Sequence, residues 1–188
     1  MSILIAGLIL FLGAHTFTTL RDARATLIAR LGEGPYKGLY SLVSAAGLVL
    51  IVWGFGRYRS AGYVPVWEPP QALHSIAIVL MWFSFVSLAA AYSPLGRIKS
   101  ALRHPMLVGV KTWALAHLLA NGDLGSILLF AAFLAWAVYD RIAVKRRGDA
   151  GAPASGVMAG DAIAVAVGTA AYAAMWWLHP LAIGVPIG

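Results

Sequence analysis

Long apolar stretches alternate with short polar segments along most of this chain. Each apolar stretch has about the 17–25 residues that an α-helix needs to cross the hydrocarbon core of a bilayer. Glycine, proline, asparagine or charged residues separate them, as expected where helices end. We therefore predict an all-α fold: a polytopic integral membrane helix bundle with six transmembrane helices, in a single domain over residues 1–188. The predicted helices are Ser2–Leu20, Gly38–Phe55, Ala72–Tyr92, Pro105–Asn121, Leu124–Val144 and Ala159–Ile183.

The segment between the first two predicted helices, Arg21–Lys37, is basic and amphipathic. Its leucine and isoleucine side chains can lie against lipid while its arginines face water or phosphate groups. Gly32 and Gly34 are expected to end it. The first predicted helix has no basic region before it and no small-residue cleavage site after it. We therefore expect a retained membrane helix and not a signal peptide.

The composition agrees with a membrane protein. The chain is 61% hydrophobic and only 11% charged, and its mean hydropathy is +0.81, whereas soluble domains are roughly 45–50% apolar and about 25% charged. It contains no cysteine. This excludes disulfides, thiolate ligation of haem, iron–sulfur clusters and cysteine nucleophiles.

The positive net charge is best explained by membrane orientation, and we expect the lipid bilayer, not nucleic acid, as the partner. Lys and Arg concentrate in cytoplasmic loops, and here eleven of the 14 lie in the segments after the first, third and fifth predicted helices or within one turn of them. Only Arg57 and Arg59 lie in the other loops. We therefore predict that both termini lie on the outer side of the membrane, which is the periplasm for the inner (cytoplasmic) membrane of a Gram-negative bacterium. The eleven are Arg21, Arg24, Arg30, Lys37, Arg97, Lys99, Arg103, Arg141, Lys145, Arg146 and Arg147.

The fourth predicted helix carries an unusual number of polar side chains. His104 precedes Pro105, a residue that suits the first position of a helix. Lys111 lies on one side of this helix. Ionisable groups inside a membrane are costly and usually serve a function, although hydrogen bonding between helices is the simpler alternative. Another side of the helix carries the stripe Val110, Trp113, His117 and Asn121.

The histidines are the candidate metal ligands, because neutral imidazole suits iron, copper or zinc. His15 and His117 point into the bundle from the middle of apolar helices, whereas His74 and His179 lie near the outer surface and are interpreted as interfacial anchors. Without cysteines or a carboxylate cluster, two histidines from different helices favour a b-type haem. We predict that His15 and His117 ligate one haem b iron from opposite faces. His104 is the reserve ligand.

Arg103 and His104 are a predicted anion site at the cytoplasmic start of the fourth helix. Free backbone N–H groups and the helix dipole favour negative charge there. The anion would be a haem propionate, a lipid phosphate or a carboxylate substrate. The alternative is that Arg103 only anchors the helix at the membrane surface. Trp113, Lys111 and Asn121 complete the predicted cofactor-binding set.

Four stretches carry a resemblance to a known family: GLILFLGAHTFTTLRDAR (7–24), RHPMLVGVKTWALAHLLANGD (103–123), LLFAAFLAWAVYDR (128–141) and the HP pair at 179–180. They resemble the NnrU family of bacterial membrane proteins. The family is associated with nitric oxide and nitrite reduction in denitrifying bacteria, so the resemblance implies such a role here. It also implies a membrane fold over most of the chain.

The family is in turn similar to plant zeta-carotene isomerase, a haem b enzyme that isomerises a cis double bond of a carotenoid. By that resemblance His15, with Arg21 and Asp22 after it, is a haem-ligand candidate. His117, with Trp113 before it, is the second. The resemblance therefore keeps open a haem-dependent isomerase that acts on a polyene lipid or another hydrophobic small molecule. The isomerase has a further histidine in the region of the fifth helix, where this chain has none.

Two other function classes remain open. An Arg-His-Pro sequence with a later glycine, here Arg103–Pro105 and Gly109, also resembles membrane methyltransferases of the isoprenylcysteine type. Those enzymes continue into a soluble part that binds S-adenosylmethionine, whereas this chain continues with a basic loop and another apolar helix. The other alternative is a non-enzymatic partner subunit or assembly factor whose polar side chains only hold its helices together.

Overall fold

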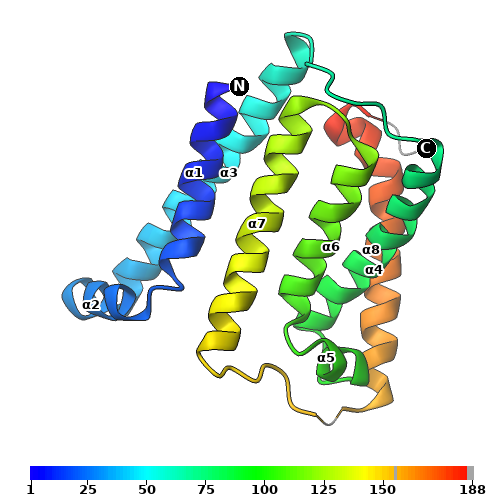
Figure 1. Cartoon of the computed structure of the whole chain (residues 1–188). Helices are drawn as coiled ribbons and strands as arrows, with labels where there is room; N and C mark the ends of the chain where they lie inside the picture. Colours follow the sequence, from blue (N-terminus) through cyan, green and yellow to red (C-terminus); the bar gives the residue numbers. More distant parts are fainter. Residues whose placement is uncertain (155, 186–188) are drawn as a thin grey trace. The chain divides into compact units, whose positions relative to one another are not determined.

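The computed structural model describes residues 1–154 and 156–185, and within them the chain forms eight α-helices (Figure 1). Each of the six predicted apolar helices is present, with ends shifted by a few residues. Two further short helices, α2 and α5, lie between them. The helices are α1 (Ser2–Phe17), α2 (Arg21–Leu31), α3 (Glu33–Ser60), α4 (Gln71–Tyr92), α5 (Arg97–Leu102), α6 (Pro105–Ala120), α7 (Leu124–Arg146) and α8 (Met158–Ile183).

The chain forms two compact units, and each is described by itself. Unit 1 comprises Met1–Val66 and Asp123–Ala132, so it holds α1, α2, α3 and the first part of α7. Unit 2 comprises Trp67–Gly122 and Phe133–Gly188, so it holds α4, α5, α6, α8 and the rest of α7. The single domain expected from the sequence stays a prediction.

In unit 1, α1 and α3 run antiparallel with their backbones in close contact (Figure 1). Glycine makes this possible, since a Cβ on Gly7 would lie 2.6 Å from the Ile51 nitrogen and one on Gly47 would lie 2.7 Å from the Phe11 nitrogen. Small residues allow such approach between apolar helices, where van der Waals contact is a main source of association. Leu4 is fully buried in this contact region.

The first predicted membrane helix ends three residues earlier than expected. α1 stops at Phe17, and α2 continues at an angle of 89° after a short break. α2 has no buried residue, and Asp22 and Arg30 lie in its first and last turns. Arg24 of this helix lies over the Tyr36 ring, 5.6 Å from its centroid. The basic segment is therefore a separate helix without buried residues, and its amphipathic contact with lipid stays a prediction.

Unit 2 is built around α4, which runs antiparallel to both α6 and α8 (Figure 1). A buried hydrogen bond of 2.8 Å joins α4 to α6, from the Ser84 hydroxyl to the Gly109 carbonyl oxygen. Gly168 lets α8 approach α4, because a Cβ there would lie 2.6 Å from the Val86 Cα. α4 is thus the central helix of this unit.

The short helix α5 was not predicted, because it depends on a distant partner. The Ile98 backbone N–H donates to Asp161 Oδ1 at 2.8 Å, so an aspartate at the start of α8 satisfies a free amide of the first turn. Lys99 donates from Nζ to the carbonyl oxygens of Ala91 and Ser93, each at 2.9 Å. These partners are remote or non-periodic in sequence, so the local pattern indicated only a loop.

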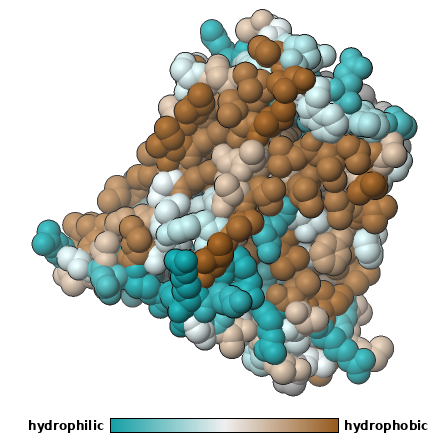
Figure 2. All heavy atoms as spheres, in the orientation of Figure 1, coloured by the Kyte–Doolittle hydropathy of each residue, from teal (hydrophilic) through white to brown (hydrophobic). Residues whose placement is uncertain are grey.

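Four of the described helices are long and apolar enough to cross a membrane, namely α3, α4, α7 and α8, and the bent pair α1–α2 gives at most a fifth. α6 has 16 residues, about 24 Å at 1.5 Å per residue, which is shorter than a hydrocarbon core of about 30 Å. Six crossings therefore stay a prediction. On the face shown in Figure 2, apolar residues cover most of the helical surface and hydrophilic residues gather mainly towards helix ends.

Candidate binding site in the second unit

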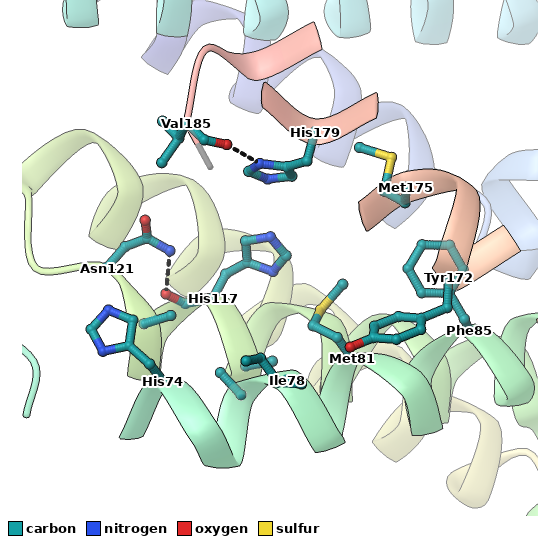
Figure 3. Close-up of a pocket in the computed structure, with 13 residues that line it drawn as sticks. His74, Ile78, Met81, Phe85, His117, Asn121, Tyr172, Met175, His179 and Val185 are labelled. Carbon is teal, nitrogen blue, oxygen red and sulfur yellow. Dashed lines mark hydrogen bonds between the residues drawn. The ribbon is translucent and has the colours of Figure 1, made fainter. Parts of the chain in front are cut away.

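A cavity of about 160 Å³ lies between α4, α6 and α8 of unit 2. Three histidines from the three helices line it, together with one asparagine (Figure 3). Its other walls are mainly apolar or aromatic. The lining residues are His74, Ala77, Ile78, Met81, Phe85, Ala116, His117, Ala120, Asn121, Tyr172, Met175, His179 and Val185.

The antiparallel packing of α4 explains why three distant histidines meet. His74 lies in the first turn of α4, whereas His117 lies in the last turn of α6 and His179 lies close to the end of α8. Because α4 runs opposite to the other two helices, its start and their ends are at the same end of the unit. The interpretation of His74 and His179 as separate interfacial anchors missed this cluster. The alternating directions of successive helices could have predicted this cluster, since they place the start of one helix beside the ends of two others.

Backbone hydrogen bonds fix two of the three rings. Nδ1 of His117 lies 2.9 Å from the Trp113 carbonyl oxygen, and Nδ1 of His179 lies 2.7 Å from the Val185 carbonyl oxygen. A carbonyl only accepts, so each Nδ1 carries the proton. In a neutral ring this makes Nε2 the acceptor nitrogen, which is the form that accepts a hydroxyl proton or binds a metal.

His74 differs from the other two histidines. Its Nδ1 is buried, and no residue in the described part of the chain makes a hydrogen bond to it. Leaving a buried polar group unpaired costs about 1–3 kcal/mol. A polar group of a bound ligand at this end of the cavity would offset that cost.

Trp113 and Asn121 both contact His117, but only Asn121 lines the cavity. The Trp113 and His117 ring centroids are 5.2 Å apart, and Trp113 also packs edge-on against Phe133 at 5.3 Å. Asn121 donates from Nδ2 to the His117 carbonyl oxygen at 2.8 Å. It therefore binds the last turn of α6 through the backbone, while its side chain borders the cavity.

A model of the NnrU protein family matches residues 3–187, nearly the whole chain. The chain belongs to the NnrU family. This confirms the resemblance that the four sequence stretches indicated. The comparisons with curated proteins and with solved structures gave no match. The similarity to plant zeta-carotene isomerase therefore stays a prediction for this member of the NnrU family.

His15, the other predicted haem ligand, lies in unit 1. Its Nδ1 is 2.7 Å from the Phe11 carbonyl oxygen, and its ring stacks on Phe11 with centroids 4.2 Å apart. Tyr40 of α3 lies beside it, at 5.5 Å between centroids. His15 and His117 belong to different units, so their ligation of one iron stays a prediction.

Arg103 and His104 contact the loop that precedes α8. The Arg103 guanidinium donates to the Ala152 carbonyl oxygen at 3.0 Å, and the Ala152 N–H donates back to the Arg103 carbonyl oxygen at 2.8 Å. His104 lies with Nε2 3.3 Å from the Asp149 carbonyl oxygen. Neither residue lines the cavity, and neither does Lys111. Of the predicted cofactor-binding set, the structure brings His117 and Asn121 to this cavity.

The donors of the cavity suit haem b, but its volume does not. Imidazole with Nδ1 bound to a carbonyl is the usual form of a haem-ligating histidine. A volume of about 160 Å³, however, is close to that of an engineered cavity of about 150 Å³ that holds benzene, and a tetrapyrrole needs far more. A bare metal ion is not favoured either, since the described residues contain no suitable group of three or more His, Asp or Glu side chains.

Proposed function

We propose that this NnrU-family protein binds a hydrophobic, ring-shaped ligand within the membrane, in the cavity between α4, α6 and α8. One observation carries the proposal: His74, His117 and His179 come from three helices and meet on one apolar cavity. Binding sites for small molecules are typically apolar with a few placed polar groups. In a membrane helix, ionisable side chains that face such a cavity usually mark a ligand or ion site.

Cavity filling tests this proposal. Ala120 lines the cavity at the end of α6, so Ala120→Phe should place a ring in the ligand space. Ala166→Phe is the matched control, because Ala166 is exposed on α8 and does not line the cavity. Mass spectrometry of solvent extracts should find a ring compound that co-purifies with the wild type and the control and is depleted in Ala120→Phe. Equal extracts from all three proteins would contradict the proposal.

Haem b is the second candidate ligand, and a different observation favours it. His15 and His117 each bond through Nδ1 to the carbonyl four residues earlier, so in the neutral rings Nε2 is the unprotonated nitrogen, the form that binds iron. When bound, haem would supply electron transfer, gas binding or double-bond isomerisation. A whole tetrapyrrole would extend beyond the described cavity, so no step is derived through haem. A wild-type protein expressed with excess haem should show a Soret band under this alternative, and a colourless protein would exclude it.

The cellular role that we propose is support of nitric oxide and nitrite reduction, as the family resemblance implies. Deletion of the gene in its host should slow consumption of these compounds, and wild-type but not Ala120→Phe protein should restore it. The isomerase alternative predicts instead a change in the cis and trans isomers of a polyene lipid. The methyltransferase alternative has no observation in its favour, because Arg103 and His104 contact the Asp149–Ala152 loop.

A further inference from the structure

We infer that the ligand of the histidine-lined cavity is the reduced headgroup of a membrane quinone, that is, a quinol with an apolar tail. This inference rests on the proposed function and names the ligand class of the same site. Three properties of the cavity carry it: the volume, the hydrogen-bonding state of the histidines and the absence of charge among the described lining residues. Each property excludes a different class of hydrophobic ligand.

The volume selects a single six-membered ring. A cavity of about 160 Å³ is close in size to one that holds benzene, and a benzoquinol is a benzene ring with two opposite hydroxyl groups. The cavity is partly open, and exposed apolar residues of α8 such as Leu181, at 82%, are typical of a lipid-facing surface. An isoprenoid or alkyl tail would therefore extend into the membrane while the ring lies between the helices.

The histidines select hydroxyl groups over a plain hydrocarbon ring. The bond from His179 Nδ1 to Val185 makes Nε2 an acceptor in the neutral ring. The bond from His117 Nδ1 to Trp113 has the same consequence. A quinol hydroxyl donates to such an acceptor, whereas a quinone carbonyl, which only accepts, does not. The buried Nδ1 of His74 gives the ligand a further polar contact. The site therefore favours the reduced form.

The lining excludes acidic ligands. No Lys or Arg is among the described residues around the cavity, so a carboxylate or phosphate would be desolvated there without a counter-ion, at high cost. Apolar and aromatic groups complete the walls. Phe85 and Tyr172, whose ring centroids are 6.1 Å apart, lie on the side away from His74 in Figure 3. They provide an aromatic surface for the face or edge of the ring.

Anaerobic calorimetry on the full chain in detergent tests the inference with four probes. A benzoquinol with a decyl tail should bind, the matching quinone should bind about tenfold more weakly because it cannot donate to Nε2, and decylbenzene should bind weakest. Tetramethylbenzoquinol, which has no tail, distinguishes a membrane-borne ligand from a free phenol: weaker binding than the decyl compound supports the inference. Equal affinity for decylbenzene and the quinol would overturn it.

Histidine variants locate the binding. His179→Leu and His74→Leu should each weaken quinol binding about tenfold and leave decylbenzene binding unchanged. Trp177→Leu and Ser75→Ala are the matched controls, since both residues are exposed neighbours outside the cavity. Quinol binding that is unchanged in both histidine variants would also overturn the inference. If a ring compound still co-purifies with the wild type and is depleted in Ala120→Phe, the proposed function stands although the quinol inference fails. If no such compound is found, the proposed function itself fails.

Discussion

The Ser84 hydroxyl donates to the Gly109 carbonyl oxygen at 2.8 Å and joins α4 to α6. Both residues are buried. Gly109 also lacks room for a side chain, because a Cβ there would lie 2.7 Å from Leu88 Cγ. Two different forces, a polar contact and close packing, therefore fix the separation of the helices that carry His74 and His117.

Removal of the polar contact should destabilise unit 2 slightly. Ser84→Ala is expected to lower the free energy of unfolding by about 0.6–1 kcal/mol, the usual contribution of a hydrogen bond between membrane helices. Gly109→Ala should cost more, about 1–3 kcal/mol, because it overpacks the contact with Leu88. Thermal unfolding in detergent measures both. Ser41→Ala, at an exposed position of α3, is the control, and an equal loss in the control would contradict the assignment.

Gly47 should be necessary for the close packing of α1 against α3. Gly47→Val places its Cβ against the Phe11 backbone, which cannot yield as a side chain can, so we expect a loss of at least about 2 kcal/mol or no folded protein. Gly56→Val makes the same change in the same helix where nothing lies within 4 Å of the Cβ. This control should stay near wild-type stability. The yield of monodisperse protein and its thermal midpoint are the measurements.

Asp161 should hold the start of α5. Its Oδ1 accepts from the Ile98 N–H at 2.8 Å, and loss of such a capping bond costs about 0.5–2 kcal/mol. Asp161→Ala should therefore loosen α5 and raise the rate of limited proteolysis after Arg97 or Lys99. Asp22→Ala, on the exposed surface of α2, is the control. Unchanged cleavage at α5 would show that this helix does not depend on the aspartate.

The sequence pattern predicted the apolar helices well and the short ones poorly, for a physical reason. Hydrophobic length depends only on local residues, so α3, α4, α7 and α8 could be located from it. α5 depends on Asp161, more than 60 residues later. The end of α1 at Phe17 was misplaced because threonine occurs both inside membrane helices and just beyond their ends. Here the hydroxyls of Thr18 and Thr19 donate to the carbonyls of His15 and Thr16.

The candidate site shows the same division between local and tertiary information. His117 and Asn121 were found because they share one helical stripe, which is a local property. His74 and His179 were set aside because each alone resembles an interfacial residue. Their meeting with His117 requires that α4 packs antiparallel between α6 and α8, which no single stretch of sequence contains. Polar residues at matching depths on neighbouring helices would have been the signal.

Arg103 should stabilise the loop before α8 and not the ligand. Its guanidinium donates to the Ala152 carbonyl oxygen, so Arg103→Gln is expected to increase proteolysis within Arg147–Ala154 while quinol affinity stays at the wild-type level. Arg97→Gln, at an exposed position of α5, controls for the loss of one charge. A fall in ligand retention without increased proteolysis would instead favour the predicted anion site.

The basic residues predict the orientation of the chain in the membrane. Seven of the eleven clustered Lys and Arg residues lie in α5, at the end of α7 or directly after one of these helices. In unit 2, α5 lies at the end opposite the cavity. If basic loops stay in the cytoplasm, the cavity lies in the outer half of the membrane. If all six predicted helices also cross the membrane, both termini are periplasmic. A reporter that is active only in the cytoplasm should be bright when fused after Gly148 and dark when fused after Gly188.

Replacement of Arg57 and Arg59 by Gln is the control, since it only strengthens the charge asymmetry and should leave both signals unchanged. A bright Gly188 fusion would place the C-terminus in the cytoplasm and refute this orientation, and a dark Gly148 fusion would do the same for the basic loop.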